Sequence, residues 1–211
     1  MPKYAYMMHN KKYNVAVVGA RGYSGLELTR ILLKHPFVNL TAIIGTDTIF
    51  TLSDYLPEIN NQSAQNIKSI SIKDLENFLA TSSQKLHTVF LATPNEVSLE
   101  LAPKFIENNI NVIDVSGAYR LESAQKSALE AKLKTEITYG LSPWADPTTK
   151  SPTLISNPGC YATSVLMPLI PLLKAGAIDS TSIVIDSKSG TTGAGRKAQE
   201  KIGRASCRER V

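Results

Sequence analysis

Residues 15–25 read VAVVGARGYSG, a run of small and β-branched residues that ends in a glycine cluster. This run predicts a strand over 13–18. Apolar residues then recur at helical spacing until the pair His35-Pro36, where the predicted helix ends. A second apolar run over 40–44 closes a strand–helix–strand unit of the usual size of ~30 residues. The glycine cluster therefore lies at the turn between the first strand and the first helix.

Strands and helices continue to alternate along the chain. Residues 45–69 are rich in Asn, Gln and Ser, which indicates loops with at most one short strand. Beyond them the pattern predicts, in order, a helix over 74–79, a strand over 88–92, a helix over 97–108, a strand over 111–115, a helix over 123–134, a loop over 141–152, a strand over 154–156, a helix from Cys160 and a β-branched run over 182–186. Strands that alternate with helices form a parallel sheet that is covered on both faces. The predicted fold class is α/β, a doubly wound Rossmann-like parallel sheet followed by the incomplete start of a second α/β domain.

We expect the first domain over residues 12–158 and the start of the second over 159–201. Residues 202–211, IGRASCRERV, begin abruptly after a well-patterned segment and look like a translated sequencing adapter. Without this tail the formal charge falls from +5 to +3, because the tail holds three arginines and one glutamate. Cys160 is then the only cysteine. A lone cysteine forms no internal disulfide, which suits a reducing compartment.

The composition predicts a soluble, globular, cytoplasmic protein. The hydrophobic fraction of 43% is sufficient for a normal core, and no stretch approaches the ~18 apolar residues of a membrane span. Residues 1–12 lack the apolar region of a secretory signal and the Arg-rich pattern of a transit peptide. Lys and Arg are dispersed and do not interleave with aromatics. We therefore expect a solvated basic surface with no nucleic-acid partner, no membrane partner and no metal ion.

The glycine loop is a candidate dinucleotide site. Gly19, Gly22 and Gly25 follow the spacing GxxGxxG, in which the middle glycine is displaced by one residue from the usual GxGxxG. At the start of a helix, free backbone N–H groups can bind a pyrophosphate. The alternative is a tight strand-to-helix turn that binds no nucleotide.

The choice between NAD and NADP depends on the residues after the second strand. Asp47 favours NAD, because a carboxylate can accept a hydrogen bond from the ribose 2'-hydroxyl and would repel a 2'-phosphate. Thr46, Thr48 and Arg21 could instead donate to that phosphate. The residues alone leave this choice open.

Cys160 is a candidate nucleophile. The sequence SNPGC at residues 156–160 follows a predicted strand and opens a helix, whose partial positive charge favours the thiolate form of the cysteine. The alternative is a buried structural cysteine, and the position of Cys160 in the sequence does not by itself distinguish the two. Residues 188–197, KSGTTGAGRK, form a second glycine-rich segment, which suits an anion or a nicotinamide ring, or else is a solvated connection.

Taken in order, these segments resemble the N-acetyl-gamma-glutamyl-phosphate reductases, which are relatives of aspartate-semialdehyde dehydrogenase. The resemblance spans residues 14–201 and is carried by VAVVGARGYSGLELTRILLKHP, VIDVSGAYRL, ISNPGCYATSVL and SKSGTTGAGRK. It implies a Rossmann-like NADP domain followed by an α/β catalytic domain, and a homo-oligomer at full length. It also implies a role in arginine biosynthesis with NADP as the cofactor, despite Asp47.

The resemblance implies a reaction as well. Cys160 attacks the acyl phosphate of N-acetyl-glutamyl phosphate, phosphate leaves, and hydride from NADPH reduces the resulting thioester to the semialdehyde. Arg120 is expected to hold the substrate phosphate, with a surface salt bridge as the alternative, and Ser116 and Asn157 are expected to bind substrate. The amides of residues 159–161 are expected to stabilise the developing oxyanion. The expected cofactor contacts are Gly19, Arg21, Gly22, Tyr23, Ser24, Gly25, Thr46, Ser189 and Gly190.

Some features depart from the family pattern. Family members extend further and supply a histidine as general acid/base, whereas His9, His35 and His87 here have no matching context. Residues 142–145, SPWA, stand where relatives usually carry an acidic residue. Pro168 should end or kink the helix that begins at Cys160. Two alternatives therefore stay open, a non-catalytic NADP-binding fragment and a semialdehyde dehydrogenase that acts on another acyl phosphate.

Overall fold

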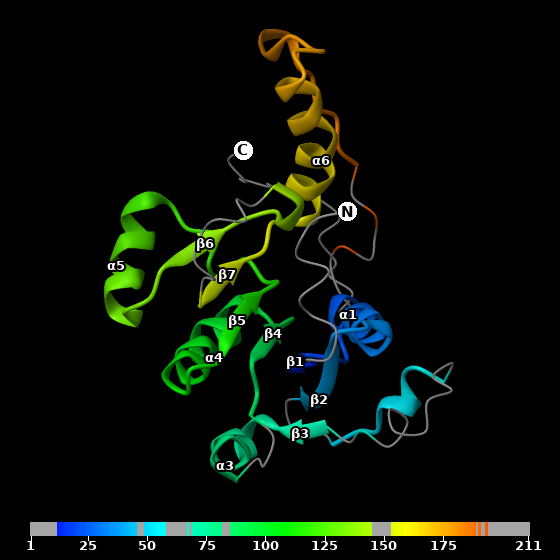
Figure 1. Cartoon of the computed structure of the whole chain (residues 1–211), viewed down its shortest axis with the longest axis vertical. Helices are drawn as coiled ribbons and strands as arrows, with labels where there is room; N and C mark the ends of the chain where they lie inside the picture. The colour runs from blue at the N-terminus through cyan, green and yellow to red at the C-terminus, as the bar shows by residue number, and fades with distance from the viewer. Residues whose placement is uncertain are drawn as a thin grey trace, which may run out of the picture.

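The computed structural model describes residues 12–45, 49–57, 67, 69–81, 85–144, 153–188, 190 and 193. A seven-stranded sheet forms its centre, and each neighbouring pair of strands is parallel (Figure 1). The strands are β1 (Tyr13–Val18), β2 (Val38–Gly45), β3 (Ser69–Ser71), β4 (Thr88–Leu91), β5 (Asn111–Asp114), β6 (Ile137–Tyr139) and β7 (Leu154–Ser156). The α-helices are α1 (Tyr23–Lys34), α3 (Leu75–Thr81), α4 (Asn95–Glu107), α5 (Ser123–Leu133) and α6 (Cys160–Lys174). The predicted α/β class with a parallel sheet is confirmed.

The strand order is β3-β2-β1-β4-β5-β7-β6. From β1 the chain first builds outward through β2 to β3, and it then returns to place β4 on the other side of β1. The direction of building therefore reverses between β1 and β4. In open α/β sheets, ligands bind beyond the carboxyl ends of the strands at such a reversal. The glycine loop that follows β1 lies at this position.

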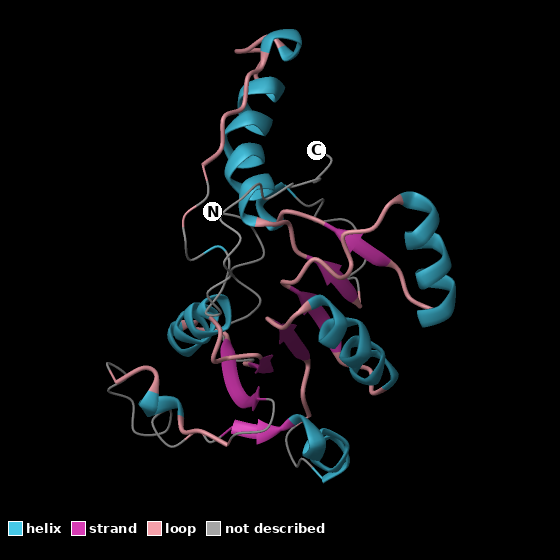
Figure 2. Cartoon of the chain, turned by 180° about the vertical axis from the view of Figure 1, so that it is seen from behind, coloured by secondary structure: helices cyan, strands magenta, loops and turns pink. Residues whose placement is uncertain are grey.

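Helices flank the sheet on both faces (Figure 2). Alternate side chains of a strand point to opposite faces, so β1 contributes to two separate cores. Val15 and Val17 pack in the core that includes Leu32 of α1, whereas Ala16 and Val18 pack in the core that includes residues of α3 and α4. All four β1 residues are buried. The apolar run that predicts this strand is thus explained by burial on both faces, as is usual in parallel sheets.

Two short segments differ from the sequence pattern. Residues 137–139 form the edge strand β6, which the pattern does not predict because only Ile137 of its three residues is buried and they form no apolar run. The β-branched run over 182–186 forms no strand: it follows the 3₁₀ turn η5 (Ser180–Ser182), and Val184 and Ile185 are exposed. A strand needs a neighbour for its backbone N–H and C=O groups. The sheet of the described residues gives 183–188 no such neighbour.

Helix α6 extends away from the sheet (Figure 1). It does not end at Pro168, because both Pro168 and Pro171 lie inside it and it continues to Lys174. A proline in a helix leaves the carbonyl one turn earlier without its N–H partner. Most of α6 is exposed or half-buried, so water can hydrate those carbonyls. None of the helices in the described part of the chain combines the length and the apolar character that crossing a membrane requires.

Candidate active site

The first and third glycines of the loop after β1 are required by close backbone packing. Gly19 has a φ of +84°, and a Cβ placed on it would lie 2.3 Å from the carbonyl oxygen of Ala92. A Cβ on Gly25 would lie 2.2 Å from the carbonyl oxygen of Gly19. No side chain can be accommodated at either position without moving the backbone.

The middle glycine leaves open space at the start of α1. A Cβ on Gly22 would meet only the carbonyl oxygen of Gly19, at an ordinary 3.5 Å. Gly22 is the N-cap of α1, no side chain caps this helix, and its first turn holds no acidic residue. The partial positive charge at the helix start is therefore not offset by a local carboxylate. This arrangement fits an anionic group such as a pyrophosphate.

Arg21 is held by two aromatic rings on the segment that follows β2. Its guanidinium carbon lies 5.9 Å from the ring centre of Phe50 and 5.6 Å from that of Tyr55. The two rings pack edge to face with their centres 5.1 Å apart. Contacts of this kind orient a guanidinium without neutralising its charge. Tyr23 and Ser24 lie exposed in the first turn of α1, while Thr46 lies outside the described residues.

Cys160 is the first residue of α6 and is exposed, so its thiol is accessible and is not a buried structural group. The N-cap is Gly159, no side chain caps the helix, and the first turn holds no acidic residue. The corner before α6 therefore repeats the features of the corner before α1. β7 lies three strand positions from β1, a separation of roughly 14 Å at the usual strand spacing.

Arg120 joins the loop after β5 to the corner that holds Cys160. Its Nε donates to the carbonyl oxygen of Asn157 over 3.0 Å, and one terminal nitrogen donates to the carbonyl oxygen of Val115 over 3.2 Å. The backbone N–H of Asn157 donates to the carbonyl oxygen of Asp114 over 2.8 Å. The fold thus brings Arg120 and Asn157 to the carboxyl edge of the sheet beside the start of α6.

Ser116 is engaged within its own loop. Its hydroxyl donates to the two carboxylate oxygens of Asp114 over 2.8 and 2.9 Å, and its oxygen accepts from the backbone N–H of Ala118 over 3.0 Å. Asp114 is fully buried. Burial raises the pKa of Asp114, and hydrogen bonds from Ser116 and Ser98 and the positive charge of Arg120 oppose this shift. Burial, together with the negative charge of Asp114, raises the pKa of Tyr119 to about 12.

Two residues of this edge are not found by the sequence reasoning. One is Asp114, the last residue of β5. The other is Asn95, the first residue of α4, whose Oδ1 accepts from the backbone N–H of Gly117 over 2.9 Å. Both stand where a strand ends or the next helix begins, at the same edge as the glycine loop. That placement is the signal that could have identified them.

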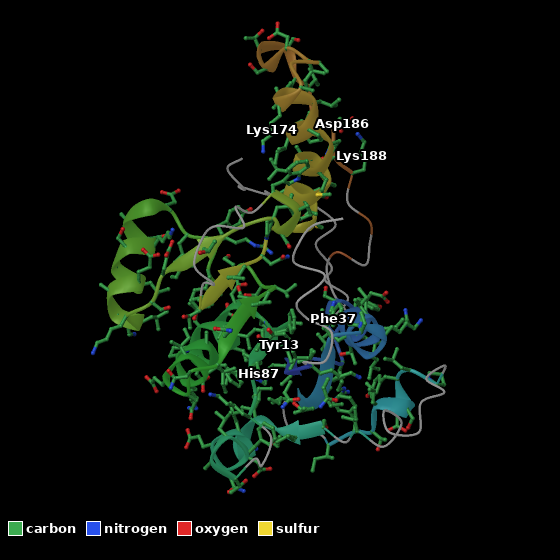
Figure 3. The ribbon with its side chains drawn as sticks, in the orientation of Figure 1. Tyr13, Phe37, His87, Lys174, Asp186 and Lys188 are labelled. Carbon is green, nitrogen blue, oxygen red and sulfur yellow. The ribbon has the colours of Figure 1, made fainter. Side chains whose placement is uncertain are left out.

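The described histidines lie elsewhere and have structural contacts. His87 lies beside Tyr13 at the amino end of β1 (Figure 3), where its Nδ1 accepts from the backbone N–H of Asn14 over 3.0 Å. The Nδ1 of His35 accepts from the backbone N–H of Phe37 over 3.2 Å. Neither histidine is at the carboxyl edge. Gly190 is exposed, while Ser189 lies outside the described residues.

Residues 14–151 match the family described as semialdehyde dehydrogenase, NAD binding domain, and residues 160–211 match the dimerisation domain of semialdehyde dehydrogenase. The chain belongs to the semialdehyde dehydrogenase family. A curated relative, the N-acetyl-gamma-glutamyl-phosphate reductase of Shouchella clausii (strain KSM-K16), is 40% identical over 86% of this chain and 53% of its own length. The chain thus spans about half the length of the curated relatives that it matches.

Solved structures of the semialdehyde dehydrogenase family share the fold. Aspartate semialdehyde dehydrogenase II from Vibrio cholerae, complexed with ASA, matches with a TM-score of 0.55 at 18% identity, over 78% of this chain and 47% of that one. Aspartate semialdehyde dehydrogenase with NADP from Candida albicans matches with a TM-score of 0.54 at 19% identity, over 77% and 47%. Residues 14–151 thus match an NAD-binding-domain family, and the chain has the fold of these dehydrogenases.

Proposed function

We propose that the full-length protein containing this chain reduces N-acetyl-L-glutamyl 5-phosphate to N-acetyl-L-glutamate 5-semialdehyde and phosphate with NADPH, as a step of arginine biosynthesis. The observation that carries this proposal is the position of Cys160. The exposed thiol of Cys160 lies at the start of α6, at the same sheet edge as the glycine loop. The chain is 40% identical, over 86% of its length, to an N-acetyl-gamma-glutamyl-phosphate reductase. The proposal includes Cys160 as nucleophile, residues 12–158 as the cofactor domain, residues 159–201 as the start of the catalytic domain, and a cytoplasmic homo-oligomer.

The chemistry follows from the residues at this edge. The thiolate of Cys160 attacks the acyl carbon, the bond from that carbon to the phosphate oxygen breaks, and a thioester forms. The free backbone N–H groups in the first turn of α6 can donate to the negative oxygen that develops during attack. When bound, NADPH supplies the hydride that reduces the acyl group. The carbon–sulfur bond then breaks, and the thiolate of Cys160 is restored.

Arg120 is proposed to bind the phosphate group. Its guanidinium is anchored to the carbonyl oxygens of Asn157 and Val115, so its charge is fixed beside the corner that holds Cys160. A planar guanidinium can offer two parallel N–H groups to a phosphate. Asn157 contributes by its backbone, because its carbonyl oxygen is the group that Arg120 contacts.

The preference for NADP is proposed to come from Arg21. Phe50 and Tyr55 hold its guanidinium beside the segment that follows β2, where the ribose of a bound dinucleotide is expected. A fixed positive charge there favours the 2'-phosphate of NADP. The relative from Candida albicans, whose fold is similar, was solved with NADP.

The test is phosphate-dependent oxidation by the full-length protein. N-acetylglutamate semialdehyde and NADP should give NADPH only when inorganic phosphate is present, and Cys160→Ala should abolish the reaction. Aspartate semialdehyde, assayed in parallel, tests the alternative that the enzyme acts on another acyl phosphate. It should react far more slowly. Turnover that is unaffected by Cys160→Ala, or that does not need phosphate, would refute the proposal.

A further inference from the structure

The carboxylate of Asp114 holds the loop from which Arg120 extends. Asp114 is fully buried, and its two oxygens accept from the hydroxyl of Ser116. Its Oδ1 also accepts from the backbone N–H of Ser116 over 3.3 Å. Three contacts from one residue to another fix both the backbone and the side chain of Ser116. The start of the loop after β5 is therefore fixed to the sheet by this carboxylate.

Hydrogen bonds to Ser116 and to its neighbour Gly117 hold the rest of the loop. The backbone N–H of Ala118 donates to the oxygen of Ser116, and the backbone N–H of Arg120 donates to the carbonyl oxygen of Gly117 over 3.3 Å. Asn95 holds the turn from its other side through the N–H of Gly117. The side chain of Arg120 leaves from the end of this turn. The direction of its guanidinium thus depends on the geometry of residues 116–120.

The backbone of Asp114 acts on the nucleophile corner as well. Its carbonyl oxygen accepts from the N–H of Asn157, whose own carbonyl oxygen accepts from Arg120. Asp114 therefore contacts the loop after β5 by its side chain and the corner before Cys160 by its backbone. Hydrogen bonds thus link Asp114 to Asn157 and Asn157 to Arg120, and Ser116 is connected to Arg120 through the backbone of the loop.

We propose that Asp114 is a positioning residue of the substrate-phosphate site, which acts through Ser116 to aim Arg120 at the corner of Cys160. The inference rests on the proposed function. It also changes the expected role of Ser116, whose single hydroxyl hydrogen is directed at Asp114. A phosphate oxygen accepts hydrogen bonds, so Ser116 has no hydrogen left to donate to it. Ser116 is thus part of the anchor and is not a phosphate ligand.

The burial of Asp114 agrees with such a role. Burying a carboxylate is unfavourable unless hydrogen bonds compensate it, and the raised pKa of Asp114 shows that burial outweighs the compensation here. The ionised form of this side chain is therefore unfavourable for the fold. A residue kept only for stability would more easily be an apolar or an amide side chain.

The experiment compares Asp114→Asn, Ser116→Ala and the double variant in the full-length enzyme. We expect each single variant to raise KM for inorganic phosphate in the oxidative direction roughly 10- to 100-fold, with a smaller effect on kcat and none on the Kd of NADP. Because both residues act on one anchor, the double variant should raise KM no further than Asp114→Asn alone. Multiplied effects would show that Ser116 binds phosphate independently and would overturn the inference.

Two further variants keep the test decisive. Asn95→Ala removes the contact with Gly117 from an exposed position, so it should fold and should raise KM for phosphate in the same direction. Ser156→Ala is the matched control: Ser156 pairs with Asp114 in the β5–β7 register and is fully buried, and its hydroxyl has no hydrogen-bond partner within the described part of the chain. It should leave KM for phosphate unchanged.

A separate measurement distinguishes failure of this inference from failure of the proposed function. Amide hydrogen exchange at residues 116–120 of the full-length protein needs no substrate, and it should be faster in Asp114→Asn than in the wild type. If the wild type shows no phosphate-dependent oxidation, the proposed function fails, and faster exchange still establishes the anchor. If the wild type is active but neither KM for phosphate nor loop exchange changes in Asp114→Asn, the inference fails alone.

Discussion

The corner between β1 and α1 and the corner between β7 and α6 are built in the same way and differ in their surroundings. In each, a parallel strand ends and a glycine N-cap without a capping side chain begins a helix whose first turn has no acidic residue. Helix α1 buries Gly25, Thr29 and Leu32 and belongs to a core cluster. Of α6 only Ala162 is buried, while Met167 and Leu172 are among its exposed residues.

This difference shows that the described residues enclose the glycine corner, between β1 and α1, more fully than the Cys160 corner, between β7 and α6. The glycine corner is enclosed by its own domain, with Ala92 against Gly19 and two rings against Arg21. The Cys160 corner is supported from the sheet side, by Asp114, Arg120 and Asn157, and carries an apolar helix that is largely exposed. We therefore expect nucleotide binding to depend on residues described here, and catalysis to need more of the protein.

The largest expected effect is at the Cys160 corner. In the full-length enzyme, Cys160→Ala should lower kcat by roughly 10³-fold or more, because the covalent step is lost. The Kd of NADPH, measured by fluorescence titration, should stay within a factor of about two to three of the wild-type Kd, because the glycine corner and not Cys160 forms the nucleotide site. Loss of NADPH binding in this variant would show that the two corners are not separate in function.

The 211-residue chain on its own should show the same separation of binding from catalysis. We expect it to bind NADP and to have negligible turnover, because the chain spans about half the length of its curated relatives and its described histidines lie away from the carboxyl edge of the sheet. Isothermal titration with NADP and a spectrophotometric assay for NADPH check both parts. Measurable turnover by the purified 211-residue chain would contradict this expectation.

A pair of substitutions at the glycine corner should separate folding from binding. Gly19→Ala should lower the free energy of unfolding by roughly 2–4 kcal/mol, since it strains a positive φ and overlaps the backbone at Ala92. Gly22→Ala meets nothing closer than 3.5 Å, so it should leave the unliganded fold stable and weaken NADP binding. Denaturant unfolding and NADP titration give the two quantities. Equal destabilisation by both variants would be inconsistent with the described backbone.

A smaller effect is expected for cofactor choice. Arg21→Ala should weaken NADPH binding roughly 10-fold, as a charge-assisted hydrogen bond is lost, and should leave NADH binding almost unchanged. Phe50→Leu keeps the guanidinium but removes one of the two rings that orient it. It should also weaken NADPH binding and leave NADH binding almost unchanged, but by a smaller factor. If both nucleotides weaken equally, Arg21 is not the group that recognises the 2'-phosphate.

The smallest effect concerns the dependence of stability on pH. Because burial raises the pKa of Asp114 above its ordinary value of 3.8, the folded state holds this proton more tightly than the unfolded state. The corresponding stability is present below pH 3.8 and is lost as the pH rises through the raised pKa. The free energy of unfolding of Asp114→Asn, relative to wild type, should therefore increase as the pH rises through this window. Denaturant titrations at several pH values measure it, and a relative decrease would contradict the pKa direction.

The sequence predicts the fold best where burial is on both faces. The apolar runs of β1 and β7 predict strands over 13–18 and 154–156, which match the observed bounds. In the edge strand β6 only Ile137 is buried, and in the described sheet this strand pairs only with β7, which is remote in sequence. The run over 182–186 has the composition of a strand but lacks a neighbour in the described sheet. A strand-like composition thus gives a strand only where the fold also supplies a neighbouring strand.

The candidate site shows the same limit. Cys160 and the glycines are found from local motifs, because a strand followed by a helix start is a feature of consecutive residues. Asp114 ends an apolar strand, and nothing nearby in sequence shows that Ser98 and Asn157 contact it. Ser116 is expected to bind substrate from the family motif alone, and its contacts with Asp114 are visible only in three dimensions.

The most direct test of the central claim is the mass of the full-length protein after reaction with N-acetyl-glutamyl phosphate in the absence of NADPH. We predict one N-acetylglutamyl group per active site, mapped to the peptide that contains Cys160 and released as the semialdehyde when NADPH is added. An acyl group on a different residue, or continued turnover when Cys160 carries none, would contradict the account.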